Sequence, residues 1–100
     1  MELRHLRSFI AATQLQSFTK AASVVGLTQA AVSQHVAALE KELGIELFLR
    51  TGRSVVPSEA GRSFYVSVHQ ALEILENGVR RTRELQIQTN SCTISGRVAS

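Results

Sequence analysis

The sequence has no tryptophan, no aspartate and only one cysteine, one proline and one tyrosine among its 100 residues. The single thiol, Cys92, excludes an internal disulfide, and no Cys/His spacing resembles a zinc site, so we expect no metal ion and no cofactor. No apolar run reaches the 18 residues expected of a membrane-spanning helix. The chain starts directly with an amphipathic pattern and shows no apolar signal-peptide core, which favours the cytoplasm.

Acidic residues are also absent from residues 3–39, because all eight are glutamates and Glu40 is the first after Glu2. The formal net charge is +3. This mild basic bias is compatible with a nucleic-acid partner, since a phosphate-facing surface needs local absence of carboxylates more than a high total charge. No carboxylate pair, nucleophile–base pair or glycine-rich phosphate loop supports an enzyme.

Apolar spacing predicts short helices at residues 3–15, 18–25 and 29–43. Ser17 and Thr28 are typical N-caps for the second and third helices, and Gly26 and Gly44 are typical stops. Leu27, in the turn between these two helices, is predicted to be buried. The fold class that follows is mainly α.

The spacing of apolar residues changes after the third predicted helix. An apolar run at 47–49 and a β-branched segment at 54–56, separated by a tight turn, predict a small β-hairpin. Ser58 then opens a long helix, predicted to end near Gln86 and to be followed by a loop and the start of a strand at 94–100. Apolar residues recur along this helix at steps of three and four: Tyr65, Val68, Leu72, Leu75 and Val79. Such a seam is typical of helices that pair, so we expect a homodimer; the alternative is a helix that packs on its own domain.

The second and third helices fit a helix-turn-helix. This motif needs a small residue where the helices cross, a permissive residue in the turn and a branched apolar residue that anchors the second helix. Ala22, Gly26 and Val32 meet these needs in order. The same spacing occurs in helical bundles, which leaves a protein-interaction module without DNA binding as the alternative.

Six segments follow a single ordered pattern, at residues 3–9, 17–22 (SFTKAA), 27–33 (LTQAAVS), 39–44, 47–53 and 58–61. The match that they define covers roughly residues 2–62, with no insertion or deletion in the spacing, and resembles the N-terminal part of LysR-type transcriptional regulators. The resemblance implies a winged helix-turn-helix at 1–57, a linker helix for dimerisation at 58–87 and a hinge at 88–100. It also implies a homodimer on an inverted-repeat operator in double-stranded DNA. The effector-binding domain of such regulators is not expected in this fragment, so no effector site is expected here.

The resemblance also implies roles for individual residues. Residues expected to read bases in the major groove are Gln29, Ala30, Ser33 and Gln34. Residues expected at the phosphate backbone are Ser17, Thr19, Lys20, Thr28 and His35. Arg50 and Arg53 match the wing, which reaches the minor groove. The family usually has proline at position 30 and arginine at position 34, so the bases that are read are not implied. The plain alternative for each residue is a solvated surface side chain.

Overall fold

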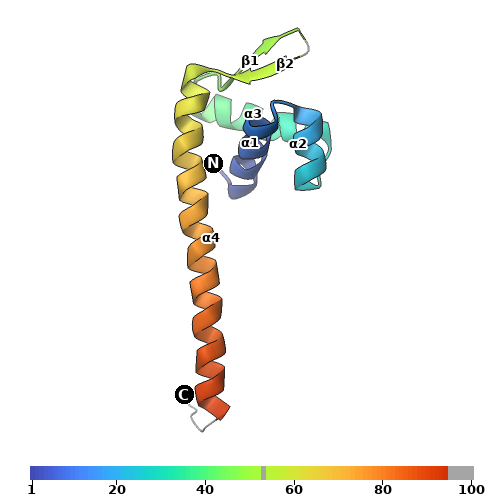
Figure 1. Ribbon diagram of the computed structural model, residues 1–100. Coiled ribbons are helices and arrows are strands. Elements are labelled where there is room, and N and C mark those ends of the chain that lie inside the picture. Colours follow the sequence, from blue (N-terminus) through green and yellow to red (C-terminus); the bar gives the residue numbers. More distant parts are fainter. Residues whose placement is uncertain (53, 95–100) are drawn as a thin grey trace. The chain divides into compact units, whose positions relative to one another are not determined.

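The computed structural model of the protein describes residues 1–52 and 54–94, with side chains described as far as Ile87 (Figure 1). The elements in chain order are α1 (Leu3–Leu15), α2 (Phe18–Val25), α3 (Gln29–Leu43), β1 (Phe48–Thr51), β2 (Ser54–Pro57) and α4 (Glu59–Ile94). Two compact units divide the chain, one from Met1 to His69 and the other from Gln70 onward, so α4 begins in the first unit. Within the described residues the fold is mainly helical with a two-stranded hairpin, as the sequence predicts.

Helices α1, α2 and α3 begin and end at the predicted residues because their local signals are strong. The side-chain oxygen of Ser17 accepts a hydrogen bond from the backbone N–H of Lys20 at 3.1 Å. Thr28 caps α3 in the same way, accepting from Ala31 at 3.1 Å. Each cap satisfies an N–H group that has no acceptor within its helix. Gly26 ends α2 at a φ of 74°, a left-handed conformation that glycine adopts without steric cost.

The first unit is built around a core shared by α1, α2 and α3. Helix α1 packs on both α2 and α3, and α2 packs on α3. Ala21 and Ala22 are 0% and 4% exposed, and their small side chains let the helices approach closely. Val32 is fully buried, as expected for the residue that anchors α3. The ring of Phe9 lies edge-on to that of Phe48, with 5.8 Å between centroids, which ties the hairpin to this core.

Leu27 differs from the prediction, because its side chain is 42% exposed rather than buried. Its backbone has the structural role instead: the N–H of Leu27 donates to the carbonyl of Ala22 at 2.9 Å, just beyond the end of α2. This bond satisfies a helix-terminal carbonyl. The apolar side chain is left on the surface of the turn.

Strands β1 and β2 form the predicted antiparallel hairpin. Phe48 pairs with Pro57, and Thr51 pairs with Ser54 across the turn. Pro57 is tolerated because it closes an edge strand at its last residue. The hairpin therefore has the place and length expected of a wing.

The base of the hairpin is fixed from two helices. Glu40 of α3 accepts hydrogen bonds at Oε2 from the backbone N–H groups of Leu47, at 2.8 Å, and Phe48, at 3.4 Å. The carbonyl of Leu47 accepts from the backbone N–H of Ser58 at 2.9 Å. Gly61 of α4 faces this carbonyl so closely that an added Cβ would overlap its oxygen and lie 3.0 Å from its carbon. The hairpin is thus held both to α3 and to the first turn of α4.

Helix α4 continues to Ile94, so the predicted end near Gln86 and the predicted loop from residue 88 are wrong. No glycine or proline occurs from residue 79 to 95. Once a helix is formed, adding a residue fixes few dihedral angles for each hydrogen bond gained, so a polar segment without a breaker extends it. The strand expected at 94–100 lies, beyond Ile94, outside the described residues.

Candidate nucleic-acid interface

The residues predicted to read bases share one face of α3: Gln29, Ala30, Ser33 and Gln34. At about 100° per residue they fall within an arc of roughly 140°. Gln29, Ala30 and Gln34 are exposed and Ser33 is half-buried. The core face lies elsewhere on the helix, where Val32, Val36 and Leu39 are fully buried. The predicted reading face is therefore accessible, polar and uncharged.

The starts of α2 and α3 favour an anion. The first N–H groups of each helix have no acceptor within the helix, and they form the positive end of its dipole. Lys20 is exposed in the first turn of α2. Residues 3–39 contain no carboxylate that would repel a phosphate. The phosphate roles of Ser17, Thr28 and Lys20 stay predictions.

Thr19 and Gln29 form a direct link between α2 and α3. The hydroxyl of Thr19 donates a hydrogen bond to Oε1 of Gln29 at 3.1 Å, and both side chains are exposed. The two residues are ten positions apart in sequence, on either side of the turn. The structure thus joins a residue predicted to lie at phosphate to one predicted to read a base.

Arg50 is exposed on β1 and reaches back to α2. Its Cζ lies 5.2 Å from the centroid of the Phe18 ring, within the range of a cation–π contact. Phe18 is the first residue of α2 and is 5% exposed, so it is a fixed platform. The guanidinium is thereby held beside the start of α2, near Ser17. Arg53, the other residue predicted for the wing, lies outside the described residues.

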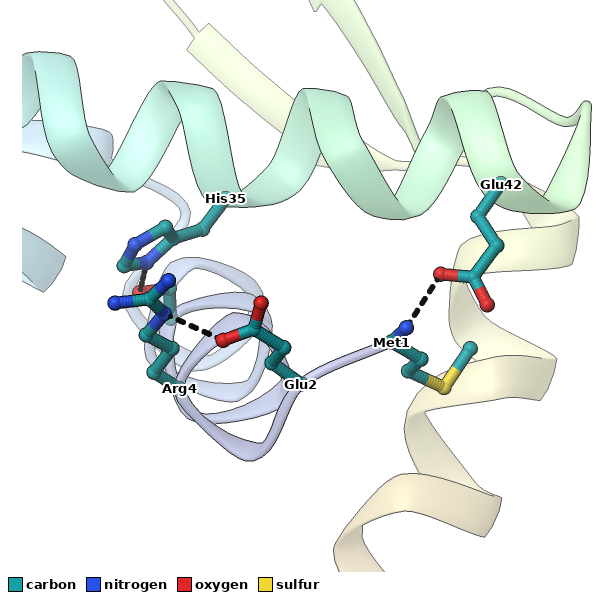
Figure 2. Close-up of polar contacts among 6 residues, drawn as sticks. Met1, Glu2, Arg4, His35 and Glu42 are labelled. Atoms are coloured by element: carbon teal, nitrogen blue, oxygen red, sulfur yellow. Dashed lines mark hydrogen bonds and ion pairs between the residues drawn. The ribbon is translucent and has the colours of Figure 1, made fainter.

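His35 contacts α1. Its Nδ1 shares a hydrogen bond of 2.7 Å with Oγ of the fully buried Ser8, and its ring centroid lies 4.9 Å from that of His5. Figure 2 shows His35 reaching from α3 toward α1, next to Arg4. Burial lowers the pKa of His35, and the neighbouring His5 and Arg4 lower it further.

The position of His35 on α3 does not match the reading face. At about 100° per residue it lies roughly 170° around the helix from the centre of that face. Its partners Ser8 and His5 belong to α1. The predicted contact of His35 with phosphate therefore gains no support and stays a prediction.

The predicted dimer seam on α4 has a covered part and an exposed part. Val68, in the unit from Met1 to His69, is 4% exposed. The hydroxyl of Tyr65 accepts a hydrogen bond of 3.0 Å from a glutamine of α1. Leu75 and Val79 are 45% and 42% exposed. Leu75 and Val79 thus have apolar surface that a second helix could cover.

Two residues that position the interface are absent from the sequence predictions. Ser8 is a polar residue at a core position of α1, and its partner lies 27 residues away. Glu40 is one of several glutamates in its region, and only the folded chain shows that it holds the start of β1. A polar residue on an apolar helix face is the one hint that could have marked Ser8.

Two other kinds of site receive no support. Within the part of the chain that the structure describes, no group of three or more His, Cys, Asp or Glu side chains is placed to hold a metal ion. No helix built from these described residues is both long and apolar enough to cross a bilayer.

Comparison with known proteins gives a consistent result. The family model described as "Bacterial regulatory helix-turn-helix protein, lysR family" matches residues 3–62. The regulator BudR of Raoultella terrigena is 37% identical over 100 residues, covering 100% of this chain and 34% of BudR. The regulator BenM of Acinetobacter baylyi is 40% identical over 85 residues, covering 85% of this chain and 28% of BenM. The chain therefore spans about a third of the length of these relatives.

Solved structures agree with these relatives. The DNA-binding domain of BenM, in complex with benA site 1 DNA, matches with a TM-score of 0.80 and 40% identity, covering 85% of this chain and 99% of that chain. Full-length CbnR, in complex with its target DNA, matches with a TM-score of 0.77 and 30% identity, covering 83% of this chain and 29% of that chain. The chain therefore belongs to the lysR family of bacterial regulatory helix-turn-helix proteins, whose DNA-binding domain its residues 3–62 form.

Proposed function

We propose that this chain binds double-stranded DNA in the bacterial cytoplasm by placing α3 in the major groove, as the DNA-binding part of a transcription regulator without enzymatic activity. The observation that carries the proposal is the exposed, uncharged face of α3, which stands apart from a fully buried core face. An α-helix fits the major groove, where each base pair presents a distinct pattern of donors and acceptors. The relatives named above are regulators, and two solved neighbours are DNA complexes, which supports this assignment.

The reading face has the groups that direct readout requires. The amides of Gln29 and Gln34 each carry a donor and an acceptor and can pair with a base edge. Ala30 presents a methyl group suited to the methyl group of thymine. Ser33 has a hydroxyl and lies between Gln29 and Ala30 on this face. No lysine or arginine occurs on α3 before Lys41. Base choice is therefore assigned to neutral side chains.

The backbone contacts are assigned to the start of α2, the start of α3 and the wing. The side-chain oxygens of Ser17 and Thr28 accept hydrogen bonds from backbone N–H groups. Their hydroxyl hydrogens are therefore left to donate to phosphate oxygens. Lys20 and Arg50 add positive charge beside them. We assign the hairpin turn, including Arg53, to the adjacent minor groove. These contacts set register and affinity, and they do not choose the sequence.

We assign dimerisation to the exposed part of α4. One side of this helix, an arc of roughly 140° at about 100° per residue, carries no charged residue. Its members are Ile74, Leu75, Gly78, Val79, Thr82, Leu85 and Gln86, while Glu73, Glu76, Arg80, Arg81, Arg83 and Glu84 occupy the remaining sides. A second copy of the same face would cover it, and a two-fold dimer presents two reading helices to two half-sites of an inverted repeat.

The test of DNA binding is selection from a random DNA pool, followed by titration of the selected site between about 50 and 200 mM salt. We expect an inverted repeat, affinity that falls steeply with salt, and loss of base preference in Gln34→Ala. Gln70→Ala, an exposed glutamine of α4 outside the reading face, is the matched control. An interaction module that does not bind DNA would show no shift at low salt and no effect of Gln34→Ala, and this result would overturn the proposal.

The test of dimerisation is sedimentation of two lysine variants. Leu75→Lys places a charge within the uncharged face of α4, and Asn77→Lys places one on its polar side. We expect only Leu75→Lys to shift the chain toward monomer. Equal mass for both variants and the wild type would contradict the assigned face.

A further inference from the structure

The link between Thr19 and Gln29 determines how an amide is presented on the reading face. Thr19 lies in the first turn of α2, and Gln29 is the first residue of α3. The Thr19 hydroxyl donates to Oε1 of Gln29 at 3.1 Å. Both residues are exposed, so core packing does not fix the end of the glutamine side chain.

This bond holds the amide of Gln29 beside α2, and in the structure the amide has one of its two orientations. The terminal torsion of glutamine is broad, and a half-turn exchanges the donating NH₂ with the accepting oxygen. With Oε1 bound by Thr19, the NH₂ group projects from the pair as the free donor. The second lone pair of Oε1 is still available as an acceptor.

We propose that Thr19 is a positioning residue that fixes the amide of Gln29 and thereby sharpens the choice of the base that Gln29 reads; this rests on the proposed function. The Thr19 hydroxyl can donate to Oε1 or accept from the NH₂ group, so it holds the amide in place in either orientation, and Gln29 can pair only with base edges within reach of this held position. The fixed amide also arrives at the groove already ordered, which reduces the conformational entropy lost on binding.

The expected effect is specific to one base pair. Holding one flexible side chain in its bound geometry corresponds to roughly a two- to tenfold gain in affinity. We therefore expect Thr19→Val, which keeps the shape and removes the hydroxyl, to reduce discrimination at the base pair read by Gln29 roughly two- to tenfold. Non-specific binding and the salt slope should stay as in the wild type, because the one hydroxyl hydrogen of Thr19 is donated to Gln29 and is not left for the phosphate contact that the sequence predicts.

The experiment is a set of anisotropy titrations on the selected site and on versions with each base pair replaced in turn. The variants are Thr19→Val, Thr19→Ser, Gln29→Ala and the double variant Thr19→Val/Gln29→Ala. Ser23→Ala removes an exposed hydroxyl elsewhere on α2 and is the matched control. Circular dichroism melting of each variant checks that the fold is retained.

The outcomes separate this inference from the proposed function. Support requires that Thr19→Val weakens discrimination at the same base pair as Gln29→Ala, that Thr19→Ser restores it, and that the double variant equals Gln29→Ala. If Gln29→Ala loses discrimination and Thr19→Val keeps it, the positioning role fails while the proposed function stands. If Thr19→Val instead lowers the salt slope and loses equal affinity at every base pair, Thr19 is a phosphate contact, and the positioning role is also overturned. If the wild type shows no base preference at all, the proposed function itself is overturned.

Discussion

Replacing Gly61 with alanine is expected to destabilise the winged domain, although alanine is the better helix former. Gly61 is buried in the first turns of α4, facing the carbonyl of Leu47. An added Cβ would overlap the carbonyl oxygen. Leu47 cannot simply move away, because it is 1% exposed and its own N–H donates to Glu40.

The magnitude follows from three contributions. Forcing an extra methyl group into a packed site costs about 1–3 kcal/mol. Displacing the Leu47 carbonyl also weakens its bond from Ser58, which costs about 1 kcal/mol. The higher helix propensity of alanine offsets about 1 kcal/mol. We therefore expect a net loss of about 1–3 kcal/mol, which lowers the Tm by roughly 5–20 °C for a domain of this size.

Thermal unfolding followed by circular dichroism checks this prediction, at one protein concentration because dimerisation shifts the Tm. The matched control is Gly78→Ala, in the same helix, where an added Cβ meets no atom of the single chain within 4 Å. Because Gly78 lies on the assigned dimer face, sedimentation checks that both variants keep the wild-type oligomeric state. Its Tm should stay unchanged or rise. Equal Tm values for Gly61→Ala and Gly78→Ala would refute the argument that Leu47 and α4 are in close backbone contact.

Three further predictions concern the hydrogen bonds and charges of the first unit. Burial holds the pKa of His35 below its ordinary value of 6.5, so the unfolded chain takes up the proton before the folded chain does as pH falls. In urea titrations the unfolding free energy should therefore decline below about pH 6.5, and it should decline less steeply in His35→Asn. Glu40→Ala leaves two backbone N–H groups at the start of β1 without an acceptor and should cost about 1–3 kcal/mol by the same urea assay. Arg50→Ala should weaken binding equally across DNA sequences and reduce the salt slope by about 1 in titrations at several salt concentrations.

Each of these predictions has a contradicting result. Parallel pH curves for wild type and His35→Asn would mean that His35 does not titrate differently in the folded state. Wild-type stability of Glu40→Ala would show that the hairpin base is held by other bonds. A loss at a single base pair in Arg50→Ala would make this arginine a base reader.

The helical part of the fold was predictable because its boundaries are set by neighbours in sequence. Ser17 and Thr28 bond to N–H groups three residues on, and Gly26 ends α2 by its own backbone conformation. The end of α4 was not predictable in this way. Residues 88–94 have a loop-like composition, and their helical state follows from the helix that precedes them. The exposure of Leu27 likewise depends on how two helices meet, which an apolar pattern does not encode.

The residues of the candidate site stay predictions from the sequence, and the contacts among them come from the structure alone. The resemblance placed Gln29, Thr19 and Arg50 at the interface. The bond from Thr19 to Gln29 and the stacking of Arg50 on Phe18 join side chains from different elements. Such pairings depend on the angle between packed helices and on side-chain rotamers, so no local pattern encodes them.

The separation of the two faces of α3 has a consequence for how such proteins diversify. Ala30, Ser33 and Gln34 lie away from the buried valines and leucine, so under the proposed function we expect substitutions there to alter operator preference with little effect on folding. A duplicated gene can therefore acquire a new target through single steps on this face, each of which leaves a folded protein. Gln29 is the exception, because it is tied to α2. A change at Gln29 is expected to be accompanied by a change at Thr19. Correlated substitution of positions 19 and 29 among relatives would be the evolutionary consequence of the hydrogen bond between them.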